Sequence, residues 1–194
     1  RKDGRNIFAD ETDRFGLSQD AYYFIGGLMK HVYSMTAITN PLVNSYKRLV
    51  SGFEAPLHIT WSVTNRSPLI RIPSSFGSGT RIELRSPDSA ANPYLTIALC
   101  LAAGLDGIKN KITPPENIQK NIFHMTEEEK EQLHIKSLPT NLYDAVCAME
   151  RDAFIREILG EHISNVYIGS KKDEWNRYCR AVTEWEVDTY LDKY

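Results

Sequence analysis

The stretch Thr80–Leu95, "TRIELRSPDSAANPYL", combines a strand pattern, a turn and a helix start. Its first part alternates charged with apolar residues: Arg81, Glu83 and Arg85 interleave with Ile82 and Leu84. Side chains of a strand point to opposite faces with a period of two, so one face is charged and the other apolar. After the turn, Asn92 can cap a helix that starts with Pro93. A strand followed by a helix in this way is typical of an α+β fold.

The segments before this stretch extend the same pattern. "LHITWSVTN" (57–65) and "PLIRIP" (68–73) are short β-rich runs, which we expect to join 80–86 in one mainly antiparallel sheet. Upstream, an apolar stripe at helical spacing follows Ser18, a candidate N-cap, and ends before Pro41. Two adjacent glycines at 26–27 cost this helix intrinsic stability. They therefore indicate that another element packs closely against it.

The segments after the opening stretch are mainly helical. The helix that starts at Pro93 is apolar on most sides to about Ala103, so we expect it to be buried. A polar connector follows, in which Thr126 and Glu129 form a possible capping box. From about Thr140 the pattern is helical to the end, with a stop at Gly160. The sequence predicts an α+β core with packed helices and a helical C-terminal tail.

Composition excludes several classes of protein. The chain has 194 residues, a net charge of −2 and a hydrophobic content of 42%, which are ordinary for a globular protein without a nucleic-acid or anionic-membrane partner. Its most apolar run, 94–105, is too short to cross a bilayer. Its cysteines (Cys100, Cys147 and Cys179) lie far apart without metal-site spacing, which predicts free thiols in a cytoplasmic protein. The chain begins at Arg1 without an initiator Met, and we expect it to be part of a longer protein.

Arginines are concentrated in the β-rich region, which contains Arg48, Arg66, Arg71, Arg81 and Arg85 together with Glu54 and Glu83. Converging guanidinium groups repel one another unless an anion lies among them, and their donor forks fit carboxylates and phosphates. A carboxylate in that group can bind a hard cation that also binds phosphate oxygens. The alternation therefore suggests a metal–phosphate site. A solvated cross-strand charge ladder gives the same pattern, and a loop glutamate such as Glu54 is more often simply solvated.

Five segments in order resemble the C-terminal half of bacterial type I glutamine synthetase: "LSQDAYYFIGGLMKH", "TNPLVNSYKRLVSGFEAP", "WSVTNRSPLIRIP", "TRIELRSPDSAANPYL" and "AAGLDGIKNKI". The resemblance runs in register from about residue 3 to 112 and more loosely to the end. It implies an ATP-dependent ligase that joins ammonia to glutamate through a γ-glutamyl phosphate. It also implies Mg²⁺ or Mn²⁺ as cofactor and a homo-oligomer, expected to be a dodecamer, with its active sites at subunit junctions.

The resemblance also implies roles for individual residues. Glu83 would bind the metal ion nearest the ATP phosphates, and Arg81 would contact those phosphates. Arg48 and Arg85 would bind glutamate. Glu54 would close over the intermediate and help to deprotonate ammonium. Arg66 and Arg71 would stabilise the transferring phosphoryl group and the nucleotide, with Arg66 counted among the catalytic residues.

Two departures limit this resemblance. The family's "GSGMH" segment and the glutamates that complete both metal sites have no counterpart here, so we expect the chain to be inactive alone. The segment "KNIFH" places Phe123 where some members carry an adenylylated tyrosine. Tyr143 of "NLYD" lies too far downstream and at a predicted helix start, so we expect no adenylylation.

The resemblance also sets the expected domain organisation. We expect residues 1–112 to form the C-terminal part of the catalytic α/β core, 113–139 a connector, and 140–194 a helical region of the same domain. Two alternative functions remain open: a non-catalytic assembly module of the same fold, and a ligase that joins glutamate to another amine.

Overall fold

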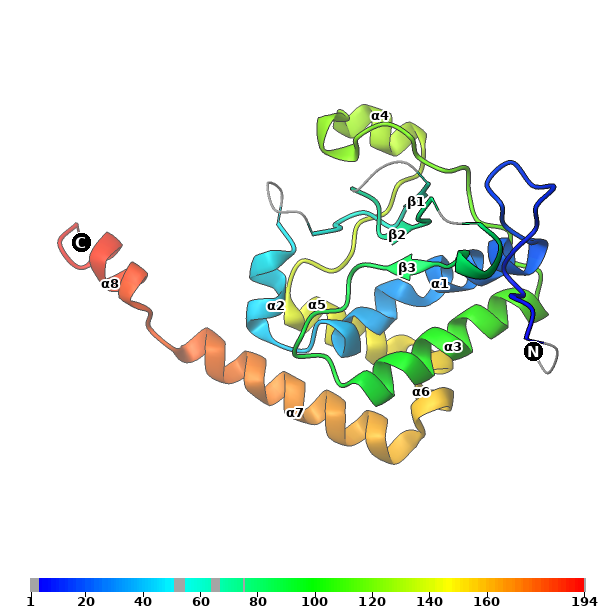
Figure 1. Ribbon diagram of the computed structural model, residues 1–194. Coiled ribbons are helices and arrows are strands. Elements are labelled where there is room, and N and C mark those ends of the chain that lie inside the picture. The colour runs from blue at the N-terminus through cyan, green and yellow to red at the C-terminus, as the bar shows by residue number, and fades with distance from the viewer. Residues whose placement is uncertain (1–3, 51–54, 64–66, 75, 194) are drawn as a thin grey trace.

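The computed structural model describes residues 4–50, 55–63, 67–74 and 76–193 (Figure 1). Its helices are α1 (Gln19–Thr39), α2 (Val43–Arg48), α3 (Pro93–Lys109), α4 (Glu127–Gln132), α5 (Leu142–Arg151), α6 (Ala153–Leu159), α7 (Glu161–Arg180) and α8 (Glu184–Tyr190). Its strands are β1 (Trp61–Ser62), β2 (Ile70–Arg71) and β3 (Glu83–Leu84). Two 3₁₀ turns, η1 (Gly77–Gly79) and η2 (Ile122–His124), lie in the connections.

The three β-rich runs form one small sheet in the order β1-β2-β3. β2 and β3 are antiparallel, with Arg71 opposite Glu83, whereas β1 and β2 run parallel. The predicted α+β class with a helical tail is confirmed. Within the described residues the sheet is mixed, so the expected antiparallel arrangement applies to its β2–β3 pair.

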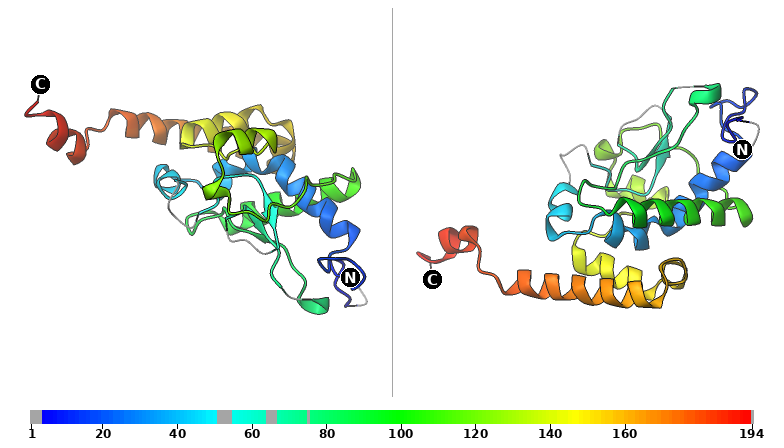
Figure 2. Two further views of the ribbon diagram at one scale, coloured as in Figure 1. Left: turned by 90° about the horizontal axis from the view of Figure 1, so that it is seen from above. Right: turned by 60° about the horizontal axis from the view of Figure 1, so that its bottom comes forward.

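Helices α1 and α3 lie side by side (Figure 2), and they pack against each other at glycines. A Cβ atom added to Gly26 would lie 2.0 Å from the carbonyl oxygen of Ile112, and one added to Gly27 would lie 2.0 Å from that of Ala103. Real Cβ atoms do not approach backbone so closely, so only glycine permits this contact. The close packing predicted at residues 26–27 is confirmed.

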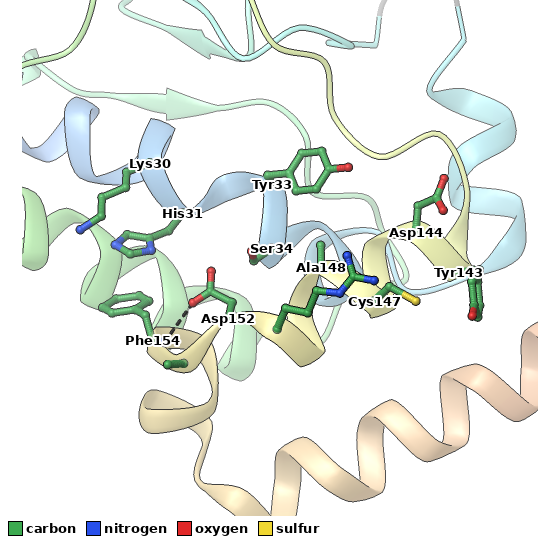
Figure 3. Close-up of a pocket in the computed structure, with 12 residues that line it drawn as sticks. Lys30, His31, Tyr33, Ser34, Tyr143, Asp144, Cys147, Ala148, Asp152 and Phe154 are labelled. Atoms are coloured by element: carbon green, nitrogen blue, oxygen red, sulfur yellow. Dashed lines mark hydrogen bonds between the residues drawn. The ribbon is translucent and has the colours of Figure 1, made fainter.

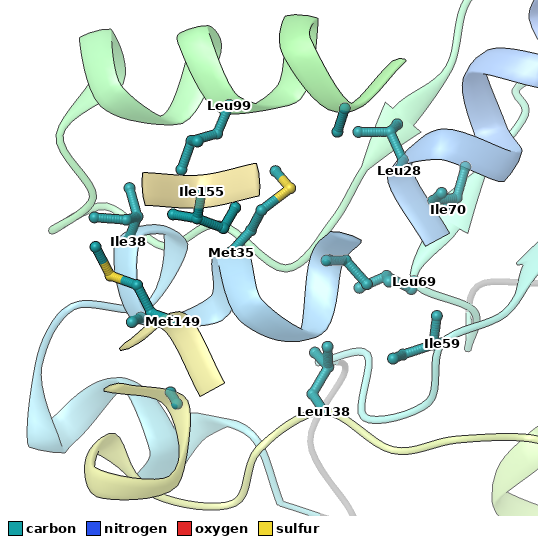
Figure 4. Packing of buried hydrophobic residues seen from close by; sticks show 14 of the residues in the cluster. Leu28, Met35, Ile38, Ile59, Leu69, Ile70, Leu99, Leu138, Met149 and Ile155 are labelled. Atoms are coloured by element: carbon teal, nitrogen blue, oxygen red, sulfur yellow. The ribbon is translucent and has the colours of Figure 1, made fainter. Parts of the chain in front are cut away.

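The core lies between α1, the sheet and the helices that follow it (Figure 4). Its fully buried members come from most of these elements: Leu28 and Met35 of α1, Ile70 of β2, Leu99 of α3, Met149 of α5 and Ile155 of α6. Burying a side chain of this size contributes about 1.5–3 kcal/mol. The core therefore joins the sheet to helices from both ends of the chain.

Helix α3 is less buried than its sequence predicts. Leu99 and Ala103 are buried, but Tyr94, Ile97 and Leu101 are 83%, 58% and 52% exposed. The prediction of a buried helix is therefore wrong for this face. Helix α1 covers one side of α3, and within the described part of the chain the opposite side stays open to solvent.

The predicted caps at the starts of α1, α3 and α4 and the predicted stop at Gly160 are confirmed, whereas α3 continues past Ala103 to Lys109. Ser18 and Asn92 accept hydrogen bonds from backbone amides at the starts of α1 and α3. Thr126 and Glu129 form the reciprocal capping box at the start of α4. Gly160 has a φ of 77°, which favours glycine, and separates α6 from α7.

The segment 113–139 runs along β1 and the residues before it. The Trp61 indole donates to the carbonyl of Pro115 at 2.7 Å, and the amide of Ile59 donates to the carbonyl of Lys136 at 2.7 Å. After it, α5 packs against α1 and α6 against α3, while α7 packs against α5 and α6, and α8 extends away from this body (Figures 1 and 2). None of the helices in the described ranges is long and apolar enough to cross a membrane.

Candidate active site

Glu83 lies between two guanidinium groups on the sheet. Its Oε1 accepts from Nε and Nη2 of Arg81 at 3.0 and 2.9 Å, and its Oε2 lies 3.4 Å from Nη1 of Arg71. Arg81 precedes Glu83 by two residues, so both side chains share a face of the chain, and Arg71 is the cross-strand partner of Glu83. The sheet register therefore assembles this cluster from two of the motifs quoted above.

The cluster is open to solvent and unevenly bonded. The side chains of Glu83, Arg71 and Arg81 are 32%, 39% and 56% exposed. Oε1 accepts from two nitrogens of Arg81, whereas among the described residues Oε2 has one contact, the long one with Arg71. A carboxylate has several lone-pair positions, so Oε2 retains acceptor capacity for a cation. This geometry also satisfies the charge-ladder interpretation, because Arg71 and Glu83 are paired directly across two strands.

The side chains of Arg48 and Arg85 are both bound by backbone carbonyls near the end of β3. Nη2 of Arg48, at the end of α2, donates to the carbonyl of Ser86 at 2.5 Å. Nη1 of Arg85 donates to the carbonyl of Pro68 at 3.2 Å, and its backbone amide donates to Leu69 at 2.9 Å. The guanidinium groups of the two arginines predicted to bind glutamate are thus each held by a backbone carbonyl oxygen, that of Ser86 or that of Pro68.

Glu54 and Arg66, the predicted catalytic residues, lie outside the described residues. Of the predicted site residues, the structure therefore positions Arg48, Arg71, Arg81, Glu83 and Arg85. Sequence reasoning missed Asn40 as part of this region. Its amide donates to the same Ser86 carbonyl at 2.9 Å, and its position before Pro41 indicated only a helix end.

Glu83 is the predicted metal ligand among the residues that the structure positions. Across the described ranges, no group of three or more His, Cys, Asp or Glu side chains is placed to hold a metal ion. Glu83 can contribute a single carboxylate, which is too few ligands for a magnesium or manganese ion. The predicted metal site would therefore need ligands in addition to Glu83.

A cavity of about 730 Å³ lies elsewhere, between α1, α5 and the start of α6 (Figure 3). None of the five predicted site residues that the structure positions lines it. His31 is at its edge, with Nε2 2.8 Å from Oδ2 of Asp106 and its ring stacked 3.8 Å from that of Phe154. Lys30 donates to the same oxygen at 2.9 Å. The hydrogen bond with His31, followed by that from Lys30, lowers the pKa of Asp106.

Tyr143 and Phe123 occupy different settings. Phe123 lies in the short η2 turn of the connector. Tyr143 lies in the first turn of α5, where the predicted helix start is confirmed, and its ring stacks on Trp175 with centroids 6.3 Å apart. The described cysteines are all free, as predicted.

A family model described as "Glutamine synthetase, catalytic domain" matches residues 1–190. The chain belongs to the glutamine synthetase family. The predicted resemblance is confirmed, and it extends over the helical C-terminal region as well as the sheet.

Curated glutamine synthetases match this chain over all or nearly all of its length. The chain is 52% identical to that of Clostridium saccharobutylicum over 193 residues, covering 100% of this chain and 44% of that protein. It is 55% identical to the glutamine synthetase of Methanosarcina mazei over 190 residues, which cover 98% of this chain and 42% of that protein. The chain thus spans less than half the length of these glutamine synthetases.

Solved structures agree with the assignment. GmaS in complex with ADP superimposes with a TM-score of 0.83 and 41% identity, covering 96% of this chain and 43% of that one. GmaS without ligand gives a TM-score of 0.81 at the same identity. The arrangement of helices and sheet described above is therefore that of the family.

Proposed function

We propose that the full-length protein containing this chain joins ammonia to glutamate at the expense of ATP. The γ-carboxylate of glutamate takes the γ-phosphoryl group of ATP and releases ADP. Ammonia then attacks the acyl carbon, loses a proton and expels phosphate to give glutamine. The observation that carries the proposal is the Glu83 carboxylate held between Arg71 and Arg81 in a chain more than half identical to curated glutamine synthetases.

The charges of this cluster suit phosphoryl transfer. The transferring group spreads negative charge over its oxygens, and fixed guanidinium groups stabilise that charge without reorganisation. We assign Arg81 and Arg71 to the ATP phosphates, with Arg66 as a further catalytic and ATP-binding residue. A guanidinium group has five N–H donors, which is more than its contact with the Glu83 carboxylate uses.

The glutamate site is assigned to Arg48 and Arg85. Both side chains are half-buried and anchored to backbone carbonyls, so their positive charges are fixed in place for a carboxylate ligand. Glu54 is assigned to the closing segment that accepts the proton of ammonium. Excluding water is necessary there because the acyl phosphate would otherwise hydrolyse.

Glu83 is assigned as one ligand of a divalent cation, Mg²⁺ or Mn²⁺. When bound, such an ion neutralises and orients the ATP phosphates. The remaining ligands would come from outside the described residues. We further propose a homo-oligomer, dodecameric as in the family, that acts in the cytoplasm.

The experiment measures phosphate release by the purified full-length protein with each substrate omitted in turn. We expect release to require glutamate, ATP and ammonia together, and hydroxylamine to trap the activated γ-carboxyl group as a hydroxamate. Replacing ammonia with methylamine or ethylamine should reduce the rate strongly. A higher rate with an alkylamine would instead favour the ligase for another amine, and no trapped product would favour the assembly module.

A further inference from the structure

The carbonyl oxygen of Ser86 is a junction between three segments that come from distant parts of the sequence. It accepts from Nη2 of Arg48 at 2.5 Å and from Nδ2 of Asn40 at 2.9 Å. Ser86 itself directly follows Arg85 and is completely buried. One backbone atom thus links the end of α1, the end of α2 and the exit of β3.

We propose that Asn40 is a positioning residue for glutamate binding, because it fixes the carbonyl that holds the Arg48 guanidinium. This inference rests on the proposed function, in which Arg48 binds glutamate. Within the residues that the structure describes, the Ser86 carbonyl is the hydrogen-bond partner of Arg48, and Nε of Arg48 is buried without one. The orientation of Arg48 therefore depends on where that carbonyl points.

Asn40 is itself held firmly. It is fully buried at the end of α1, and its backbone amide donates to the carbonyl of Thr36 at 2.8 Å. Oδ1 of Asn40 accepts from Oγ1 of Thr39 at 3.0 Å, which fixes the amide so that Nδ2 faces Ser86. The carbonyl of Thr39 accepts from the amide of Asp88 at 3.0 Å, so the chain after Ser86 is tied to the same helix end.

The chemistry of the junction requires a donor at position 40. A carbonyl oxygen has two lone pairs, and here Arg48 and Asn40 each use one. Aspartate at position 40 would have the shape of asparagine but no N–H group when ionised, and it would repel the carbonyl or attract Arg48 away from it. Alanine would leave one side of the carbonyl without a partner, so that its direction would no longer be fixed.

The test uses Asn40→Ala and Asn40→Asp in the full-length protein, with steady-state KM values measured separately for glutamate and ATP. We expect the KM for glutamate to rise about tenfold, as for loss of a hydrogen bond to a charged group, with kcat and the KM for ATP little changed. In an Arg48→Ala background, Asn40→Ala should raise the KM for glutamate no further. Such non-additivity is not expected of a residue that only stabilises the fold.

If the Asn40 variants do not fold, two less disruptive variants test the same inference. Thr39→Val removes the hydroxyl that orients Asn40, and Thr36→Val removes the hydroxyl that donates to Val32 at 2.9 Å one turn earlier. Both threonines are fully buried on α1, so the two changes cost similar packing. We expect Thr39→Val to raise the KM for glutamate two- to threefold, on the order of a partly lost neutral hydrogen bond, and Thr36→Val to leave it unchanged.

Several outcomes would overturn the inference. Equal rises in the KM values for glutamate and ATP in the Asn40 variants would mean that Asn40 has only a structural role. The same rise in the KM for glutamate in Thr39→Val and Thr36→Val would mean this too. A normal KM for glutamate in Asn40→Ala, with a raised one in Arg48→Ala, would overturn this inference alone. A normal KM in Arg48→Ala would overturn it together with the role of Arg48 in the proposed function.

Discussion

Gly27 of α1 and Gly107 of α3 touch each other through their backbones. A Cβ atom on either residue would lie 2.7 Å from the amide nitrogen of the other and 2.8 Å from its Cα. A Cβ on Gly107 would also lie 2.0 Å from the carbonyl oxygen of Tyr23. The contact is therefore between two helix backbones, and flexible side chains cannot move aside to relieve it.

Gly107→Ala should destabilise the protein by about 3 kcal/mol or more, because the two helices must separate to admit one methyl group. Gly169→Ala is the matched control, since a Cβ on this glycine of α7 meets nothing within 4 Å. The control should gain about 0.5–1 kcal/mol from its higher helix propensity. Urea midpoints of the two variants measure the difference. Equal midpoints would show that the helices adjust without cost.

Asp106→Asn should lower stability at neutral pH by about 1–2 kcal/mol, because it weakens charge-assisted hydrogen bonds with His31 and Lys30. The folded-state pKa of Asp106 is lowered, so its contribution is present above the ordinary aspartate range and lost as pH falls through the folded value. The difference between variant and wild type should therefore vanish in strong acid. Urea unfolding at a series of pH values measures it.

The control for this pH series is Asp173→Asn. Asp173 pairs with Arg177 at 3.1 Å, but both side chains are largely exposed, so the change should stay within about 0.5 kcal/mol at every pH. A constant loss for Asp106→Asn down to the lowest pH would mean that its carboxylate charge contributes nothing.

Tyr143 should carry no AMP. Its ring stacks on Trp175 with centroids 6.3 Å apart, and it lies in the first turn of α5, far downstream of the position where some members carry the modified tyrosine. Peptide mass spectrometry of native protein from nitrogen-replete cells checks this expectation. A Tyr143 peptide heavier by one AMP would contradict it, and so would release of AMP by phosphodiesterase from that peptide.

The local structure was predictable where single residues determine it. Ser18, Asn92 and Gly160 act within one helical turn, so their caps and stop follow from the sequence. The open face of α3 was not predictable, because apolar residues such as Ile97 indicate burial but not which element covers them. The pairing of Arg71 with Glu83 depends on strand register, and the Asn40–Ser86 bond joins residues 46 positions apart.

Glu54→Ala should reduce ammonia-dependent turnover of the full-length protein far more than it weakens ATP binding. Removing the proposed proton acceptor affects the step in which ammonia attacks, typically by about 10²–10⁴-fold for general base catalysis. The rate should partly recover as pH rises, since free ammonia then replaces ammonium. Glu161→Ala, at the exposed start of α7, is the control and should leave both quantities unchanged. Equal losses in turnover and ATP affinity would argue against a role for Glu54 in proton transfer.

Glu83→Ala distinguishes a ligand site from a charge ladder. If Glu83 only pairs with Arg71 and Arg81, its removal costs roughly 0.2–1 kcal/mol of stability and leaves turnover intact. If it helps to bind the cation, phosphoryl transfer should fall by about 10²–10³-fold. Glu83→Gln should reduce the rate of phosphoryl transfer nearly as much as Glu83→Ala, because glutamine keeps the shape and an acceptor oxygen but not the negative charge.

The control for Glu83 is Glu150→Ala, which removes a 2.7 Å ion pair with Lys172 on the C-terminal helices. It should cost no more stability than Glu83→Ala and leave phosphoryl transfer unchanged. Assembly of all three variants is compared by analytical ultracentrifugation, and their rates are measured over a range of Mg²⁺ and Mn²⁺ concentrations. Near-normal rate and metal dependence in Glu83→Gln would leave the charge ladder as the explanation of the Arg-Glu-Arg alternation. A rate that recovers partly at high metal concentration would instead assign the lost carboxylate to the cation.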